Sequence, residues 1–193
     1  MENDKFFYLA SGSPRRREIL SSAGQNFKVY KSSFEEVADK TLTPEETVKY
    51  FAYKKAEDVF LKTNKPCLGA DTVVVFNGKI IGKPHSDEEA VKILKELSGN
   101  MHEVITGVAV VKKDKTITDV VSTKVYFNDL TDEFINGYVL SGKASDKAGA
   151  YGIQDGGFAK SIEGSLTNVV GLPMERTEEI LKEVDLWQQT KKR

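Results

Sequence analysis

Two kinds of apolar pattern run along the chain. Consecutive or alternating apolar residues predict β-strands over residues 6–10, 66–76, 104–111 and 116–127. Apolar residues spaced by three or four positions predict helices that begin near Ser13, Thr43, Ser86, Thr131 and Pro173. Because strands and helices intermix from end to end, we expect a mixed α/β fold in which residues 1–193 form a single domain.

The expected helices have clear boundaries. Ser13 can cap the first helix, Pro14 fits its first position, and Gly24 provides a left-handed stop. Thr43 and Glu46 have the spacing of a capping box, and the second helix is expected to run to about residue 61. Its apolar stripe consists of Val48, Phe51, Ala52, Ala56 and Val59.

The connections carry equally local signals. Asn77-Gly78 predicts a two-residue hairpin turn that leads into the segment K-I-I-G-K-P. Residues 144–157 are too rich in glycine and alanine for a regular element, and we expect a close-packed loop there. The basic tail K-K-R at residues 191–193 is expected to be frayed.

The composition excludes several classes of protein. With 39% hydrophobic and 30% charged residues and a net charge of -1, the chain is typical of globular proteins, and the balanced charge argues against broad nucleic-acid binding. The single cysteine, Cys67, precludes an intramolecular disulfide and is expected to be buried as a small apolar residue. No apolar run approaches the roughly 20 residues that span a bilayer, and no signal peptide is evident, so we expect a cytoplasmic protein without a membrane partner.

Three consecutive arginines stand where a helix start disfavours them. Arg15, Arg16 and Arg17 fall in the first turn of the first predicted helix, where the macrodipole and free N–H groups favour anions. A phosphate could accept hydrogen bonds from that helix terminus, from the Ser11 and Ser13 hydroxyls and from the guanidinium groups. The alternative is a solvated basic turn, since the penalty is only about 0.3–1 kcal/mol per charge.

Two charged residues interrupt apolar patterns. Lys55 lies within the stripe of the second helix, where it either extends past the core or points into a cleft that holds a phosphate. Asp71 stands in the strand segment A-D-T-V-V-V and could bind a metal or act as a general base towards water, unless it simply forms a turn. Glu35 and Glu36, in the loop before the second helix, could share that metal or form a solvated acidic loop.

Further polar groups come from segments whose backbone must pack tightly. Lys83 lies in G-K-P, and Lys147 and Gln154 lie in the glycine-rich segment. Together with the carboxylates they predict a polyphosphate substrate and a divalent cation. His85 and His102 fit neither a metal pair nor a nucleophile elbow, so no role is assigned to them. The sequence contains neither a P-loop nor a post-strand G-x-G-x-x-G motif, which disfavours the two commonest nucleotide folds.

The segments with these unusual residues resemble those of the Maf proteins, septum-formation-type nucleoside triphosphate pyrophosphatases related to the inosine triphosphatase fold. The shared motifs are L-A-S-G-S-P-R-R from Leu9, F-A-Y-K-K-A around Lys55, G-A-D-T-V-V-V with the hairpin ending G-K-P, L-S-G-N-M-H-E-V-I-T-G-V, D-K-A-G-A-Y-G-I-Q and N-V-V-G-L-P. The resemblance covers almost the whole chain. It implies an elongated mixed sheet flanked by helices, with two lobes around a cleft, in a cytoplasmic protein that is commonly a homodimer.

The resemblance also implies a reaction and its residues. The family cleaves nucleoside triphosphates between the α and β phosphates with a divalent metal, Mg or Mn. Asp71 resembles the proton acceptor that activates water, and Glu36 resembles an acidic position that helps Asp71 to hold the metal. The residues that resemble the phosphate clamp are Ser11, Arg15, Arg16, Lys55 and Lys83. We expect water to attack the α-phosphorus while arginines, lysines and metal neutralise the departing pyrophosphate.

Substrate choice is implied by three positions. The branch that acts on dTTP and UTP carries S-P-R-R, D-T and G-I-Q, as here with Arg15, Thr72 and Gln154, whereas the 7-methyl-GTP branch carries S-P-W-R, D-Q and a different loop. Ser165 and Leu166 depart from an acidic and an aromatic residue common in the family, a change that could alter the pocket edge. The alternatives are cleavage of 7-methyl-GTP or another modified nucleotide, and a nucleotide-binding regulator of cell division.

Overall fold

The computed structural model describes residues 5–37 and 39–188, and within these ranges seven strands form one sheet. The strands are β1 (Phe7–Leu9), β2 (Phe27–Val29), β3 (Cys67–Phe76), β4 (Lys79–Ile81), β5 (Met101–Lys112), β6 (Lys115–Phe127) and β7 (Ala159–Glu163). Their order is β2-β1-β3-β5-β6-β7, and β4 pairs with β3 beside this path. β1 is parallel to both β2 and β3, whereas the remaining pairs are antiparallel, so the sheet is mixed.

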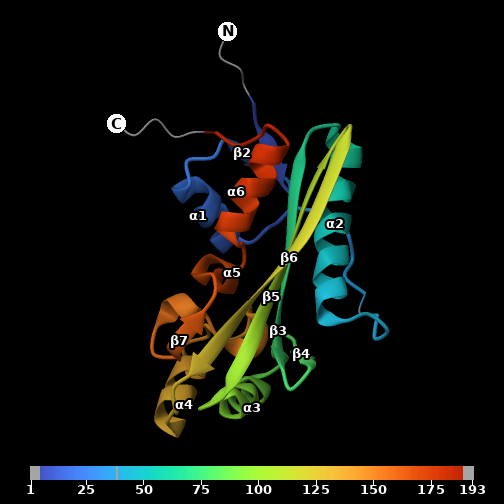
Figure 1. Ribbon diagram of the computed structural model, residues 1–193. Coiled ribbons are helices and arrows are strands. Elements are labelled where there is room, and N and C mark those ends of the chain that lie inside the picture. The colour runs from blue at the N-terminus through green and yellow to red at the C-terminus, as the bar shows by residue number, and fades with distance from the viewer. Residues whose placement is uncertain (1–4, 38, 189–193) are drawn as a thin grey trace.

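Helices cover the sheet differently at its two ends. They are α1 (Pro14–Ser22), α2 (Pro44–Thr63), α3 (Asp87–Leu97), α4 (Asp132–Leu140), α5 (Leu166–Val170) and α6 (Met174–Glu183), with 3-10 turns at Ala148–Ala150 and Ile153–Asp155. Figure 1 shows α2 on one side of the long strands and α1 and α6 on the other, all near the end where the chain begins and finishes. At the opposite end lie α3, α4 and β7. The part of the chain that the structure describes has no helix long and apolar enough to cross a membrane.

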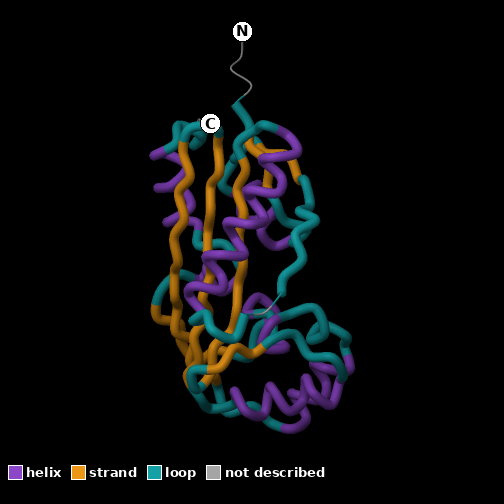
Figure 2. Tube along the Cα trace, turned by 90° about the vertical axis from the view of Figure 1, so that its right-hand side faces the viewer, coloured by secondary structure: helices purple, strands orange, loops and turns teal. Residues whose placement is uncertain are grey.

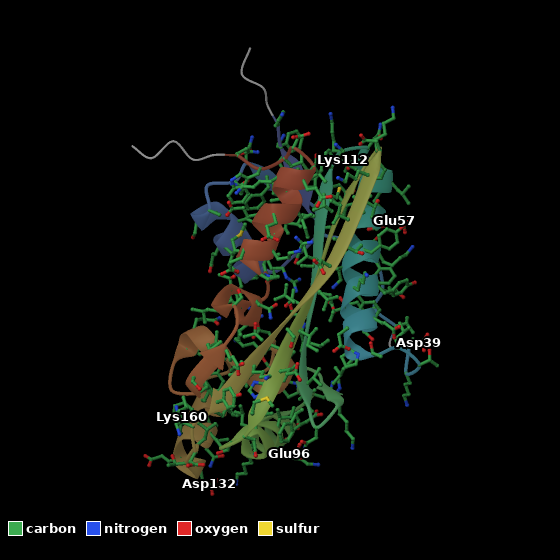
Figure 3. All side chains as sticks on the ribbon, viewed as in Figure 1. Asp39, Glu57, Glu96, Lys112, Asp132 and Lys160 are labelled. Atoms are coloured by element: carbon green, nitrogen blue, oxygen red, sulfur yellow. The ribbon has the colours of Figure 1, made fainter. Side chains whose placement is uncertain are left out.

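The long hairpin of β5 and β6 connects the two lobes. Figure 2 shows its strands running along most of the length of the molecule. Lys112 lies at the end near α2, whereas Glu96 and Asp132 lie at the end formed by α3 and α4, where Lys95 Nζ pairs with Asp132 Oδ1 at 2.8 Å (Figure 3). The elongated, two-lobed architecture expected from the sequence is therefore observed.

Each lobe has its own apolar core. In one lobe α2 packs through Ala52, Ala56 and Val59 on the sheet, and the opposite face receives Ile180 and Leu181 of α6. The other lobe is filled by aromatic and aliphatic side chains, including Leu94, Val104, Phe127, Ile135, Tyr151 and Phe158. The apolar core is therefore divided into separate clusters along the sheet.

Two glycines bring α2 unusually close to the sheet. A Cβ atom at Gly69 would lie 2.1 Å from the Ala52 carbonyl oxygen, and one at Gly107 would lie 2.2 Å from the Val48 carbonyl oxygen. Gly107 is the cross-strand partner of Asp71, and Gly69 lies two residues before Asp71 on the same face of β3. The helix backbone therefore rests against the strand that carries Asp71.

Local signals placed most elements correctly. Ser13 accepts a hydrogen bond from the Arg16 amide, the capping box at Thr43 forms in full, and Gly24 has a positive φ of 67°. The structure extends α2 to Thr63, slightly beyond the expected end near residue 61. The basic tail at residues 191–193 lies outside the described residues.

Three short elements were missed by the sequence patterns. They are β2, with three residues, β7, with five, and α5, with five. β2 and β7 each contain mostly exposed or half-buried residues and form at the margins of the sheet, so neither has a run of buried apolar positions. α5 is too short to display a helical period, and Gly171 ends it.

Candidate active site

A hollow between the lobes collects the residues that the sequence singled out. Its cavity volume is about 210 Å³, and it is partly open to solvent. Most of the predicted site residues line it: Ser13, Arg15, Arg16, Glu36, Lys55, Asp71, Thr72, Lys83, Lys147 and Gln154. Glu35 does not, and lines a separate hollow beside Phe34 and Tyr50, so the structure does not support its predicted share in a metal site. Ser11 lines an adjoining hollow that shares Arg15, Lys55 and Lys83 with the first. Segments far apart in the chain thus meet at one site.

The sheet leaves an opening at this point. β3 pairs with β5 over Cys67–Val75, but on its other edge it pairs with β1 only at residues 67 and 68 and with β4 only at 74–76. Asp71 and Thr72 lie between these two short partners. Their edge of β3 is therefore free of a neighbouring strand among the described residues and is accessible from the cleft.

A lysine joins two carboxylates at the centre of the hollow. Lys55 Nζ lies 2.7 Å from Asp71 Oδ1 and 2.5 Å from Glu36 Oε1. Asp71 is only 7% exposed, and burial raises its pKa, although the positive charges of Lys55 and Arg16 oppose that shift. Lys55 therefore points into the cleft and not past the core, and Asp71 is a strand carboxylate with raised basicity and not a turn residue.

Arg16 links the start of α1 to β3 and to the turn that follows α5. Its Nη1 donates to Ser11 Oγ at 3.2 Å, its Nη2 to Thr72 Oγ1 at 3.0 Å, and its Nε to the Gly171 carbonyl at 2.8 Å. The Thr72 hydroxyl lies a further 2.9 Å from that of Thr106. Three guanidinium nitrogens are thus engaged by protein groups, which fixes the direction of Arg16 towards the cleft.

The other two arginines of the triplet differ. Arg15 Nη1 lies 3.7 Å from Asp146 Oδ2, across the cleft, and Asp146 also pairs with Lys147 Nζ at 2.8 Å. Arg17 is exposed and lines neither hollow. The basic helix start is thus a solvated turn only at Arg17, whereas Arg15 and Arg16 face the site.

The glycine-rich segment is anchored by a buried histidine and tyrosine. His102 Nε2 lies 2.7 Å from Tyr151 Oη, and the two rings meet edge to face. Burial lowers the pKa of His102 to about 4, so its imidazole is neutral at neutral pH. Tyr151 lines the hollow beside Val74 and Val104. His102, to which the sequence assigned no role, therefore holds one wall of the site from behind.

A second tyrosine fixes the next turn of the same segment. Tyr138 Oη donates to Asp155 Oδ2 at 2.7 Å and accepts a hydrogen bond from the Gly152 amide at 3.0 Å. Gly149, with a φ of 71°, packs so closely on Val74 that a Cβ atom would lie 2.9 Å from it. These contacts shape the loop that presents Gln154 to the hollow.

Sequence reasoning missed Asp146, Tyr151 and Lys31 as residues of the hollows. Asp146 and Tyr151 stand in the segment already noted for its close packing, and their polar groups could have been noticed there. Lys31 follows the missed strand β2, in a stretch without any periodic pattern, so no comparable signal marked it.

The donor set fits a metal that is shared with a substrate. The described residues contain no group of three histidine, cysteine or acidic side chains that could hold an ion by themselves. Asp71 and Glu36 provide two carboxylates around one ammonium group. Mg²⁺ is commonly held by one or two carboxylates together with substrate phosphates and water, and these two residues suffice for that kind of site.

Comparison with known proteins identifies the family. Residues 6–184 match the family described as Maf-like protein. The chain is a member of the Maf family. It is 46% identical over 176 residues, 90% of this chain and 95% of the relative, to the dTTP/UTP pyrophosphatase of Geobacillus sp. (strain WCH70). It is 49% identical to the dTTP/UTP pyrophosphatase of Geotalea uraniireducens (strain Rf4), over 86% of this chain and 88% of that protein.

The fold is also found in a solved structure of low sequence identity. A HAM1 protein from Coxiella burnetii aligns with this Maf protein at a TM-score of 0.53 and 16% identity, covering 92% of this chain and 98% of the other. This likeness concerns the fold alone. The expected mixed α/β architecture of the inosine-triphosphatase type is thereby confirmed.

Proposed function

We propose that this Maf protein hydrolyses dTTP and UTP to the monophosphate and pyrophosphate. The observation that carries the proposal is the buried Asp71 carboxylate, paired with Lys55 at 2.7 Å in a cleft lined by further arginines and lysines. Relatives 44–49% identical over most of the chain are named dTTP/UTP pyrophosphatase, which supports the same reaction here.

In the proposed mechanism Asp71 accepts a proton from a water molecule, whose oxygen attacks the α-phosphorus. The bond from the α-phosphorus to the bridging oxygen breaks, and pyrophosphate leaves with the electron pair. The raised pKa of Asp71 suits a base, and Lys55 orients the carboxylate. Arg15 and Lys83 neutralise the leaving group. A divalent cation, Mg or Mn, held by Asp71 and Glu36, would supply additional positive charge next to the phosphates.

We assign the nucleobase to the part of the hollow lined by Thr72, Val74, Val104, Tyr151 and Gln154, which we call the base end. Apolar walls with a few polar groups are typical of sites that bind a flat heterocycle. Polar side chains at the edge of such a site can form hydrogen bonds with the carbonyl and imide groups of uracil or thymine.

The departures at Ser165 and Leu166 do not support a different substrate. Ser165 Oγ donates to Glu175 Oε2 at 2.8 Å and caps α5, and Leu166 is 55% exposed. Neither residue lines the hollow. Because neither departure reaches the hollow, the identities of Thr72 and Gln154, which do line it, favour dTTP and UTP over 7-methyl-GTP.

The biological setting is proposed from the family resemblance. We propose a cytoplasmic homodimer that acts on free nucleotides and requires neither nucleic acid nor membrane. A nucleotide-binding regulator of cell division would use the same cleft without hydrolysis. The placement of Asp71 and Glu36 around Lys55 favours the enzyme, because a carboxylate near the phosphates weakens simple binding of an anion.

The test is an assay of the purified protein with dTTP, UTP, CTP, GTP and 7-methyl-GTP in the presence of Mg²⁺ or Mn²⁺. We expect pyrophosphate as the product, fastest release from dTTP and UTP, and loss of release when the metal is chelated by EDTA. Orthophosphate as the sole product would refute cleavage between the α and β phosphates. Nucleotide binding without any product would favour the regulator.

A further inference from the structure

The cleft continues past the carboxylates into a second hollow. This hollow has Gly12, Lys31 and Ser32 in its lining, which the first lacks, and it shares Lys55 and Lys83 with the first. Lys55 is the partner of Asp71, so the reacting centre stands between the two hollows. A triphosphate with its base at the base end and its α-phosphorus beside Asp71 therefore extends its β and γ phosphates into the second hollow, which we call the phosphate end.

Lys31 is held at the phosphate end by an anchored loop. The Tyr30 amide donates to the Leu9 carbonyl at 3.1 Å. On the other side of Lys31, Ser32 Oγ and the Ser33 amide both donate to Asp58 Oδ2 at 2.9 Å. Asp58 belongs to α2. Burial opposes its charge, but hydrogen bonds from Lys62, Ser33 and Ser32 outweigh this and lower its pKa to about 2, so the anchor is ionised at neutral pH.

The side chain of Lys31 lies over the glycine that follows Ser11. A Cβ atom at Gly12 would stand 3.5 Å from Lys31 Cδ and 3.8 Å from Lys31 Cε, which is ordinary contact distance. The lysine stem thus crosses the loop that leads into α1, where Ser11 and Ser13 present their hydroxyls to the cleft. This places a flexible ammonium group next to the helix start.

Within the described part of the chain, Lys31 differs from Arg15 and Lys55 in having no carboxylate partner. Arg15 pairs with Asp146, and Lys55 pairs with Asp71 and Glu36. Lys31 and Lys83, in contrast, have no carboxylate within 4.0 Å among residues 5–37 and 39–188. Two unpaired ammonium groups at one end of a cleft attract an anionic group there, and the part of the substrate that reaches them is the terminal phosphate.

We propose that Lys31 binds the terminal phosphate of the substrate and then the pyrophosphate product, and so helps the enzyme to select triphosphates over diphosphates. This inference rests on the proposed function for the orientation of the nucleotide. Lys31 binds the leaving group and takes no proton in the reaction, so its contribution is to affinity and not to the chemical step.

The experiment compares Lys31→Gln with Lys28→Gln. Lys28 lies on β2 with its ammonium group 4.4 Å from the Phe6 ring centroid, and it lines neither hollow, so it controls for the loss of one positive charge. We measure kcat and KM for dTTP and dTDP, and inhibition by magnesium pyrophosphate and by dTMP. Because a hydrogen bond to a charged group is worth about 1.5–3 kcal/mol, Lys31→Gln should raise the pyrophosphate inhibition constant and the KM for dTTP about tenfold or more.

The remaining readouts identify the contact. For Lys31→Gln we expect a kcat within about twofold of wild type, unchanged inhibition by dTMP and unchanged kinetics with dTDP. Lys31→Arg should partly restore the affinity for pyrophosphate, and Lys28→Gln should behave like wild type. Two results for Lys31→Gln would overturn the assignment. One is an unchanged inhibition constant for pyrophosphate, and the other is inhibition by dTMP that is weakened as much as inhibition by pyrophosphate. An equal effect of Lys28→Gln would mean that only net charge matters, and this would also overturn it.

The inference can fail separately from the proposed function. Calorimetric titration of wild type and Lys31→Gln with magnesium pyrophosphate requires no turnover. If wild type releases no pyrophosphate from dTTP, the proposed function is wrong, and the titration still decides whether Lys31 binds this anion. Equal affinity of the two proteins, or no binding by wild type, would refute the role of Lys31.

Discussion

The two ends of the cleft are built by different means. At the phosphate end, exposed lysines such as Lys31 and Lys83 line the hollow beside the start of α1. At the base end, Tyr151 and Val104 come from a packed core, and His102 supports the wall from behind. Binding at one end therefore depends on solvent-exposed charges, whereas the shape of the other end depends on buried packing. Substitutions at the two ends should therefore alter different quantities.

The largest expected effect lies at the centre, between the ends. Asp71→Asn keeps the size of the side chain but removes the proton acceptor, and general-base catalysis is worth about 100- to 10,000-fold. We expect kcat to fall within this range while the KM for dTTP changes little, as measured by pyrophosphate release at saturating metal. A wild-type kcat would show that Asp71 is not the base.

The next effect concerns stability at the base end. The pKa of His102 is about 4 in the fold and about 6.5 in the unfolded chain, so the unfolded chain binds the proton more readily. The contribution of neutral His102 to the free energy of unfolding is therefore fully present above pH 6.5. It is lost as the pH falls towards 4, which lowers the free energy of unfolding by about 3 kcal/mol. Urea unfolding at several pH values should show this slope in wild type and in His85→Gln, an exposed control, but not in His102→Gln. An undiminished slope in His102→Gln would contradict the assignment.

A smaller effect is expected from the loop that presents Gln154. Tyr138→Phe removes the hydrogen bonds to Asp155 and to the Gly152 amide, and each such bond is worth about 0.5–1.5 kcal/mol, or somewhat more where the partner is charged. The KM for dTTP should rise several-fold while kcat and inhibition by pyrophosphate remain unchanged. Weaker inhibition by pyrophosphate would show that the two ends are not independent.

The smallest expected effect is at the mouth of the cleft. Asp146→Asn removes the carboxylate that competes with substrate for Arg15 and Lys147. Exposed ion pairs are worth about 0.2–1 kcal/mol, so the KM should fall by no more than about fivefold, and the difference should disappear at high salt. A higher KM for Asp146→Asn would show that this carboxylate positions Arg15 for the substrate.

The same contrast explains how much the sequence predicts. Arg16, Lys55 and Asp71 were recognisable because each opposes its local pattern, and the structure brings all three into one hollow. Tyr151 lies in the glycine-rich segment already noted for its close packing, but nothing local to His102 distinguishes it from an ordinary strand residue. Their pairing depends on a contact between positions 49 residues apart.

The strands β2 and β7 were missed for a related reason, although the fold class and most elements were predicted correctly. Helices with caps, such as α2 with Thr43 and Glu46, carry their boundaries in a few adjacent residues. β2 and β7 contain few buried positions and exist because neighbouring strands offer hydrogen-bonding partners. The missed β2 also left Lys31 without a structural context, so its place beside Gly12 could not be inferred from the chain alone.

Gly69 and Gly107, which lie beneath α2, determine how closely Lys55 can approach Asp71. With no side chain at position 69 or 107, the helix can lie low enough for Lys55 to meet Asp71. Even a methyl group at either position would have to raise the helix, and the lysine would be carried away with it. The distance between the two charges is thus set by side-chain atoms that are missing from β3 and β5. Selection for activity should keep both positions free of side chains, although neither one lines either hollow.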